Sequence, residues 1–132
     1  MASPPPPTGS PAGPTNLGVA PNVGGLLCYA PCCIGLIFSI VAVIVEKQSR
    51  FLRFHAFQSL FFHGAVIVLG IGFQILTMAI SMVSGALGAI FSLLVLVLSL
   101  GLLVAQILLM VKAYNGEEWE LPTIGPMARK YV

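Results

Sequence analysis

The feature that most constrains this chain is a series of long apolar segments that carry no charged side chain. They run over residues 24–45, 60–83 and 86–111. A helix rises about 1.5 Å per residue, so about 20 apolar residues cross the ~30 Å hydrocarbon core of a bilayer. The pattern therefore predicts an all-α fold, an integral membrane helical bundle with three transmembrane helices.

Composition supports lipid as the surrounding solvent. Charged side chains make up 8% of the sequence and hydrophobic ones 58%. A soluble domain has roughly 25% charged residues because its surface must stay hydrated. This chain lacks such a surface, which argues against a soluble enzyme. The net charge of +2 is too small to indicate nucleic-acid binding.

The N-terminal residues 1–23 differ from the rest, with most of the chain's prolines and few apolar side chains. Proline supplies no amide donor, so we expect this tail to be disordered or PPII-like. The membrane domain is expected over residues 24–130, with a cytoplasmic tail at 112–132. Residues 1–23 also lack the basic and apolar regions of a signal peptide, which favours a bacterial inner membrane.

Two local signals concern the ends of the predicted spans. Pro31 is expected to kink the first span or to lie in its first turn. Ser84-Gly85 leaves little room for a loop, so spans two and three are predicted to form a tight antiparallel hairpin.

The segment between the first two spans, residues 46–58, is both basic and aromatic. Its cations and phenylalanines are Lys47, Arg50, Phe51, Arg53, Phe54 and Phe57. A short interfacial segment of this kind lies in the headgroup region, with its rings toward the acyl chains and its cations on anionic headgroups. The first turns of a long second helix would have the same composition, so the sequence leaves both interpretations open.

The positive charges predict the orientation of the chain. Two basic groups flank the spans, Lys47, Arg50 and Arg53 before span two, and Lys112, Arg129 and Lys130 after span three. Three spans bring both groups to one side, which the positive-inside rule makes cytoplasmic. The protein is thus expected in the cell membrane with its N-terminus outside and its C-terminus in the cytoplasm.

Spans two and three carry polar residues at helical spacing. The candidates for this intramembrane face are His63, Gln74, Thr77, Ser81 and Gln106. Polar groups are costly against lipid tails, so we expect the face to point into protein. The preferred interpretation is a packing seam between helices, and the alternative is the lining of a permeation route.

Span one has a seam of small residues that favours close helix packing. Its members are Cys28, Cys32, Gly35, Ser39 and Ala42. We interpret the three cysteines as packing residues, because their spacing matches no common zinc pattern. No catalytic motif accompanies them, so the sequence predicts no enzyme activity, no cofactor and no metal site.

Two stretches carry a family resemblance. Residues 46–60 resemble the EK-x-x-x-F-x-R-F-H-A-x-Q-S signature of small bacterial membrane proteins related to the Tic-twenty component of the plastid protein-import machinery. Residues 115–128 resemble the ending of that family, G-x-x-x-x-LP-x-IG-x-x-A. The matched positions are Arg53, Phe54, His55, Gln58, Ser59, Leu121, Pro122 and Gly125. The resemblance implies an integral membrane protein whose plastid relatives act in preprotein translocation, and it gives these residues no catalytic role.

The motif also has a physical interpretation. His55 and Gln58 lie one helical turn apart, so both side chains can bond to the tail or to the end of span one. We expect the motif to dock the tail at Leu121 and Pro122 on the cytoplasmic side.

Together, these features predict a non-enzymatic multi-pass membrane protein that is a subunit or scaffold of a membrane assembly, which the resemblance relates to protein translocation. The alternative is a small transporter or channel that acts as an oligomer. The expected partners are the lipid bilayer, with anionic headgroups near Lys47, Arg50 and Arg53, and other membrane proteins or further copies of the chain. No nucleic acid is expected.

Overall fold

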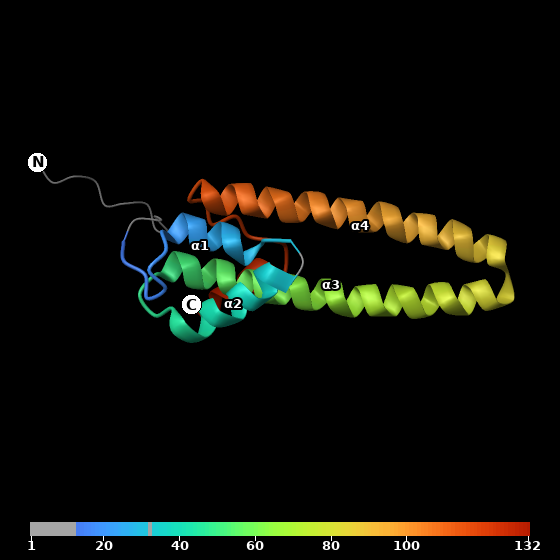
Figure 1. Cartoon of the computed structure of the whole chain (residues 1–132), viewed down its shortest axis with the longest axis horizontal. Coiled ribbons are helices and arrows are strands. Elements are labelled where there is room, and N and C mark those ends of the chain that lie inside the picture. Colours follow the sequence, from blue (N-terminus) through green and yellow to red (C-terminus); the bar gives the residue numbers. More distant parts are fainter. Residues whose placement is uncertain (1–12, 32) are drawn as a thin grey trace, which may run out of the picture.

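The computed structural model describes residues 13–31 and 33–132, and this part of the chain is helical without strands. Its helices are α1 (Pro21–Cys28), α2 (Cys33–Val45), α3 (Arg50–Val83), α4 (Gly85–Tyr114) and α5 (Ile124–Arg129). The all-α class is confirmed for the described residues. Figure 1 shows α3 and α4 as two long antiparallel helices, with the shorter helices gathered around one end of the pair.

The long pair is joined by a turn of minimal length. Ser84 is both the residue that ends α3 and the N-cap of α4, and its side chain accepts a hydrogen bond from the amide of Leu87 at 3.4 Å. Its extended backbone, with φ −153° and ψ 119°, reverses the chain between the helices. The tight hairpin predicted at Ser84-Gly85 is confirmed.

Helix α3 begins ten residues earlier than the predicted second span. The Ser49 side chain caps it by accepting a hydrogen bond from the amide of Leu52 at 3.2 Å. The basic and aromatic segment is therefore not a separate interfacial element. From Arg50 onward it forms the first turns of α3, which is the second of the two interpretations that the sequence left open.

The expectation of one continuous span over residues 24–45 is wrong. The chain turns back after α1, because Pro31 has no amide hydrogen to continue the helix. Helix α2 then packs so closely on this turn that a Cβ at Gly35 would overlap the backbone carbonyls of Cys28 and Ala30. Among the described residues, two helices are long and apolar enough to cross a membrane, α3 and α4, rather than the expected three.

The N-terminal segment lies at the same end of the molecule as the first basic group. The Asn16 side chain accepts hydrogen bonds from the amides of Lys47 at 2.7 Å and Gln48 at 3.2 Å. A three-span path would place Asn16 at the opposite end, so the expected separation of the N-terminus from the basic loop does not hold. The tail is also shorter than expected, since α1 begins at Pro21, and residues 1–12 lie outside the described part.

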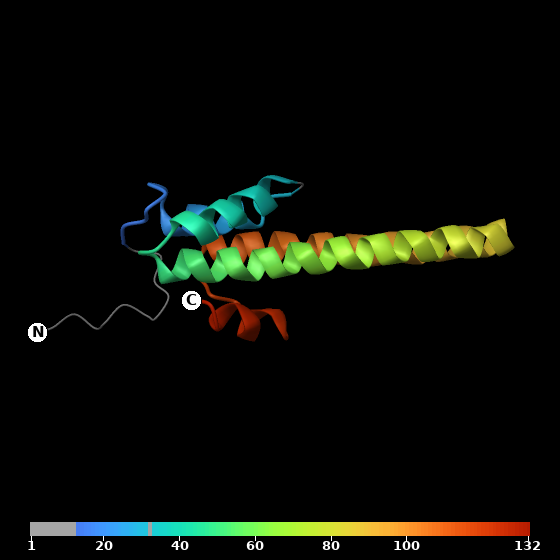
Figure 2. The same cartoon turned by 90° about the horizontal axis from the view of Figure 1, so that it is seen from below.

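The buried core lies at one end of the long hairpin. We call this end the base bundle, formed by α1, α2, α5, residues 50–63 of α3 and residues 106–114 of α4. Its central buried residues are Cys28, Tyr29, Ala42, Leu52, Ala56, Phe62, Leu109 and Ala113. Figure 2 shows α1 and α2 on one side of the hairpin and α5 on the other.

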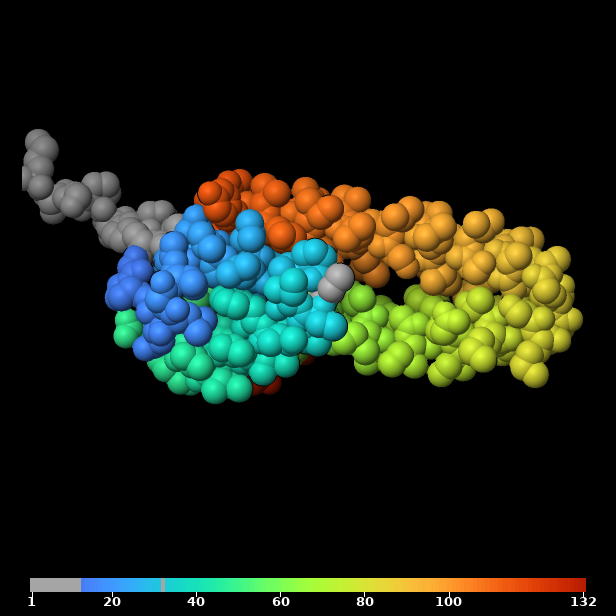
Figure 3. Space-filling model, viewed as in Figure 1, coloured from blue at the N-terminus to red at the C-terminus, as the bar shows by residue number. Residues whose placement is uncertain are grey.

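The remainder of α3 and α4, residues 64–83 and 85–105, extends beyond the base bundle, and we call it the bare hairpin. Figure 3 shows the wide base and the narrow bare hairpin in space-filling form. The two helices contact each other here through Phe73 and Phe91, whose ring centroids are 6.3 Å apart. Their outward side chains are exposed, among them Val68 at 70% and Met82 at 88%. An apolar surface of this kind is suited to lipid.

Candidate functional site

The candidate site is a polar network inside the base bundle, centred on one face of α3. His55, Gln58 and Ser59 lie three and four residues apart, so a helix places them on adjacent turns. All three side chains are completely buried. Polar side chains are stable in such a position only when their hydrogen bonds are satisfied, so their partners define the site.

Gln58 uses its whole amide group. Its Nε2 donates to the Tyr29 hydroxyl at 3.0 Å and to the Trp119 carbonyl at 2.9 Å. Its Oε1 accepts from the backbone amide of Leu121 at 3.1 Å. The side chain thus binds the tail backbone on both sides of Glu120, as a neighbouring strand would.

His55 connects the same tyrosine to an earlier part of the tail. Its Nε2 lies 3.1 Å from the Glu117 carbonyl, and its Nδ1 lies 3.2 Å from the Tyr29 hydroxyl. A carbonyl only accepts, so Nε2 carries the proton and Nδ1 accepts from Tyr29. The edges and faces of Phe51 and Phe54 enclose the ring, with centroids 4.6 Å and 5.2 Å away. The expected contact of His55 and Gln58 with the tail is present.

Ser59 anchors the turn between α1 and α2. Its hydroxyl donates to the Cys28 carbonyl and lies 3.0 Å from the Ser39 hydroxyl. Ser39 also donates to the carbonyls of Cys28 at 3.1 Å and Gly35 at 2.7 Å. From α4, Gln106 donates to the Tyr29 carbonyl at 2.9 Å. These bonds satisfy carbonyls that the end of α1 leaves without helical partners.

A buried carboxylate holds the N-terminal segment at the outer end of the base bundle. Glu46 accepts hydrogen bonds from the amides of Asn16 and Gln48, each at 2.8 Å, and of Ser49 at 2.9 Å. Burial by itself raises the pKa of this carboxyl, but the backbone hydrogen bonds outweigh it and lower the pKa below its ordinary value. Glu46 is therefore ionised and acts as a cap for three amides.

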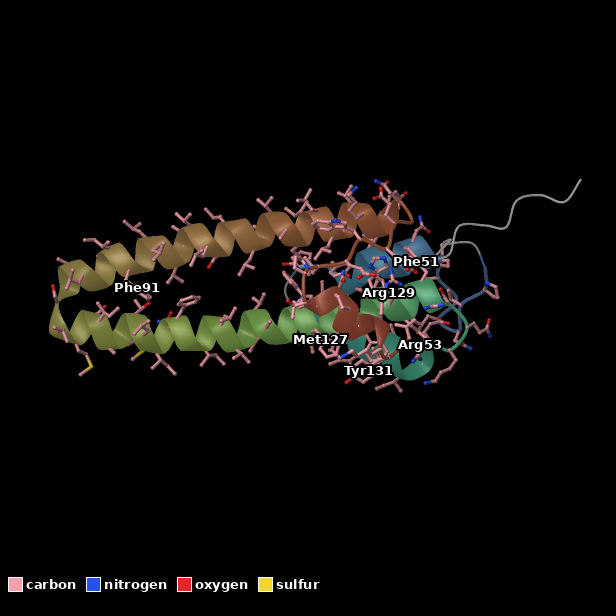
Figure 4. The ribbon with its side chains drawn as sticks, turned by 180° about the vertical axis from the view of Figure 1, so that it is seen from behind. Phe51, Arg53, Phe91, Met127, Arg129 and Tyr131 are labelled. Atoms are coloured by element: carbon pink, nitrogen blue, oxygen red, sulfur yellow. The ribbon has the colours of Figure 1, made fainter. Side chains whose placement is uncertain are left out.

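Ion pairs close the tail over α3. Arg129 pairs with Glu118 at 2.8 Å and with Glu120, and its guanidinium carbon lies 4.5 Å from the centroid of the Phe54 ring. The hydrogen bond to Glu120 and the negative charge of both carboxylates raise the pKa of Arg129. Figure 4 shows Arg129 close to the start of α3, at the same end as Arg53.

Arg53 connects the end of α2 to the C-terminal tail. It donates to the Glu46 carbonyl at 2.8 Å and to the Tyr131 carbonyl at 3.1 Å. The Tyr131 ring stacks on Phe57, with centroids 5.4 Å apart. The matched motif positions Arg53, Phe54, His55, Gln58 and Ser59 are thus all used in packing, and Gly125 lies against Glu120 so closely that a Cβ would overlap it.

The geometry is that of a hydrogen-bonded network that joins three parts of the chain. Tyr29 donates to His55 and accepts from Gln58, so donors and acceptors pair off inside the protein. Within residues 13–31 and 33–132, no group of three or more metal-binding side chains is found. The network can hold α1, α3 and the tail in one arrangement.

The predicted intramembrane face is not brought together. Thr77 and Ser81 donate to the carbonyls of Phe73 and Thr77 in their own helix, and the Gln74 side chain is exposed. His63 bonds through Nδ1 to Ser59, while its buried Nε2 has no partner in the described part of the chain. Gln106 lies in the base bundle. The small-residue seam is buried at Cys28, Gly35, Ser39 and Ala42, and Cys32 lies outside the described residues.

Sequence reasoning missed Tyr29 and Glu46. Tyr29 lies within an apolar segment. The available signal was its hydroxyl, because a buried tyrosine hydroxyl needs a polar partner. Glu46 directly follows the first apolar segment, and no role was predicted for it. The available signal was an acidic residue three positions before the N-cap Ser49, because its carboxylate lies within reach of the amides just ahead of the helix, those of Gln48 and Ser49.

Comparison with known proteins places the chain among membrane proteins. A model of the magnetosome magnetite crystal formation protein family matches residues 15–128. One UPF0132 membrane protein of Methanocaldococcus jannaschii is 36% identical over 119 residues, covering 90% of this chain and 94% of that protein. A second one from the same organism is 33% identical, covering 87% and 72%. A UPF0132 membrane protein of Archaeoglobus fulgidus is 31% identical, covering 84% and 94%. No solved structure matches.

These matches correct the expected family. The resemblance to the Tic-twenty-related proteins is not supported, and the relatives are archaeal rather than bacterial. The motif residues form the contact between α3 and the tail. A short pattern of this kind indicates a local contact and does not identify a family. The match over residues 15–128 includes α1 to α4 and all but the last residue of α5, and the chain belongs to the magnetosome magnetite crystal formation protein family.

Proposed function

We propose that the protein is a non-enzymatic, two-span subunit of a membrane assembly, in which the base bundle fixes the position of the bare hairpin. The observation that carries this proposal is the contrast between the two halves of α3. Gln58 is fully buried in a satisfied network, whereas side chains of the bare hairpin such as Val68 are 70% exposed and apolar. The half of α3 in the base bundle is suited to rigid packing, and the half in the bare hairpin is suited to contact with lipid.

The charges support one orientation of this subunit. All six Lys and Arg residues of the chain lie in the base bundle or its connections, and the turn at Ser84-Gly85 has none. The positive-inside rule then favours a cytoplasmic base, with the hairpin turn on the opposite side. Both ends of the described chain would lie on the cytoplasmic side.

Gln74 supports assembly with other membrane proteins or further copies. Its side chain is exposed in the bare hairpin, and no hydrogen bond joins it to another described residue. An amide facing acyl chains is costly, and an amide in a second helix relieves that cost by about 0.6–2 kcal/mol. The transporter alternative has less support, because Thr77 and Ser81 bond to their own helix and leave no continuous polar route.

The family description concerns magnetite crystal formation, and the carboxylates of this chain restrict how it would take part. The sequence has four acidic residues, and all four are described. Glu46 is buried, Glu118 and Glu120 pair with Arg129, and Glu117 pairs with Lys112 at 2.8 Å. We infer that a role in crystal formation would act through the membrane assembly rather than through an acidic surface that binds iron.

The test is the oligomeric state of the full chain in lipid nanodiscs, measured by native mass spectrometry. We expect oligomers for the wild type and a loss of about 1 kcal/mol in association free energy for Gln74→Leu. Gln48→Leu is the matched control, because Gln48 is exposed at the base end. A monomeric wild type, or equal association of wild type and Gln74→Leu, would contradict assembly through this residue.

A further inference from the structure

The length of α3 sets the depth of each part of the molecule in a bilayer. From Arg53 to Val83 the helix rises about 45 Å, close to the ~40–45 Å thickness of a bilayer with its headgroups. When Arg53 lies at the headgroup surface on the basic side, Ser84 reaches the opposite headgroup layer. Ser59 then lies about 36 Å from the hairpin turn, near the boundary between headgroups and acyl chains on the basic side.

Helix α2 lies beside this boundary and cannot cross the membrane. Its 13 residues rise about 20 Å. The Ser39–Ser59 hydrogen bond fixes its middle at the depth of Ser59. The turn before it lies at the depth of Gln106, which bonds to the Tyr29 carbonyl. The α1–α2 hairpin therefore enters on the basic side and returns to that side.

The two faces of α2 have opposite partners. Gly35, Ser39 and Ala42 face the base bundle and are buried. The outer face consists of exposed β-branched apolar side chains, Ile34, Ile37, Ile40, Val41, Ile44 and Val45. Lys47 and Arg50, both exposed, follow directly at its base end. An apolar stripe that ends in cations matches the acyl chains and anionic headgroups of one leaflet.

The opposite side of the α1–α2 hairpin is also apolar. A groove of about 400 Å³ between α1 and α4 is lined mainly by apolar side chains, including Leu26, Leu103 and Met110. Residues 17–45 contain no charged side chain. Acyl chains of the same leaflet can therefore contact the α1–α2 hairpin on both sides.

We propose that the α1–α2 hairpin is embedded in the leaflet on the basic side and widens the protein there, so that the protein favours membranes in which that leaflet is convex. This proposal rests on the two-span arrangement proposed above. Of the helices that the structure describes, parts of α1, α2, α3 and α4 lie in the leaflet on the basic side, and α3 and α4 alone lie in the opposite leaflet. Figure 1 shows this change in width along the long axis.

The depth of α2 is tested by tryptophan fluorescence in vesicles with brominated acyl chains. In a Trp119→Phe background, single tryptophans replace Ile37, Leu94 in the bare hairpin, or Gln48 at the base end. We expect quenching at positions 37 and 94 and little at 48. Quenching at 94 without quenching at 37 would overturn the proposal and leave the two spans intact. No quenching at 94 would contradict the spans themselves.

The shape effect is tested with lipid tubes pulled from giant anionic vesicles that carry labelled protein with its base outward. We expect the wild type to be enriched on the tube about twofold or more relative to the vesicle. The variant Ile34→Ser, Ile37→Ser, Ile44→Ser removes apolar groups that the base bundle does not cover, and it should lose the enrichment. Hydrogen exchange at Leu121 reports whether the variant keeps its fold. Equal density of the wild type on tube and vesicle, or equal enrichment of a folded variant, would overturn the proposal.

Discussion

The side-chain oxygen of Gln58 accepts a hydrogen bond from the amide of Leu121, 63 residues further along the chain. The side-chain nitrogen of Gln58 donates to the Trp119 carbonyl and to the Tyr29 hydroxyl. One buried side chain therefore connects the N-terminal hairpin, the long helix α3 and the tail. Gln58 is thus one of the side chains that fix the position of the tail, beside the contacts of Arg129 and Tyr131 with α3.

Replacing Gln58 by Leu is expected to release the tail. Leucine has a similar volume but leaves the Leu121 amide and the Trp119 carbonyl without partners. A buried unpaired group costs about 1–3 kcal/mol, so the unfolding free energy should fall by about 2–3 kcal/mol. Hydrogen exchange of the amides at residues 117–125, measured in nanodiscs, should accelerate. Gln48→Leu, at an exposed site, is the control and should leave exchange unchanged; slow exchange in Gln58→Leu would contradict the assigned role.

Gly35 and Gly70 form a matched pair for testing the fold-back of α2. A Cβ at Gly35 would overlap the carbonyls of Cys28 and Ala30, whereas a Cβ at Gly70 would have nothing within 4 Å. Gly35→Ala should destabilise the protein by about 1–3 kcal/mol through overpacking. Gly70→Ala should be neutral or stabilise it by up to about 1 kcal/mol, because alanine favours a helix. Thermal unfolding in detergent compares the two, and equal effects would show that α2 does not pack closely on α1.

The Glu46 carboxylate gives the base bundle a defined dependence on pH. Its pKa is lowered from an ordinary value of 4.5, since hydrogen bonds from backbone amides outweigh the effect of burial. A group with a lowered folded-state pKa contributes its full stability above the unfolded value and loses it as the pH falls through the folded value. The protection of the Asn16 and Ser49 amides against hydrogen exchange, relative to the intrinsic rate at each pH, should therefore fall below pH 4.5. Glu46→Gln should show faster exchange already at pH 7 and little further change on acidification.

Local sequence signals were sufficient for the long hairpin. The apolar length of α3 and α4 and the Ser84-Gly85 turn are properties of adjacent residues, which hydropathy detects directly. For the tail contact, the sequence indicated only the helix side. His55 and Gln58, one turn apart, were expected to bond either to the tail or to the end of span one, and the partner at Leu121 lies 63 residues away.

The α1–α2 hairpin and the span count required information that is distant in the sequence. Pro31 is compatible with a kinked span as well as with a turn, and hydropathy does not separate these. The turn is favoured because Ser59 and Gln106 satisfy the carbonyls of Cys28 and Tyr29. Those partners lie in α3 and α4, so a reading of residues 24–45 alone could not reveal the turn. The bond between Asn16 and Lys47, which places the N-terminal segment at the basic end, also joins residues far apart in the sequence and has no local signal.

Arg129 and Lys130 are adjacent cations with different environments, which allows a direct test of how the tail is held. Arg129 pairs with Glu118 and Glu120 and lies over the Phe54 ring, whereas Lys130 is exposed. A partly exposed ion pair alone contributes little, but the bonded guanidinium stacked on an aromatic ring should add about 1–2 kcal/mol to tail docking. Arg129→Ala should therefore increase proteolysis of the segment after Lys112, and Lys130→Ala should stay within about 0.5 kcal/mol of the wild type. Arg129→Lys separates the two contributions, since lysine keeps the charge but not the fork that reaches both glutamates. If all three variants were cleaved at the wild-type rate, Arg129 would not hold the tail, which would then depend on its other contacts, among them the Gln58 and His55 bonds and the stacking of Tyr131 on Phe57.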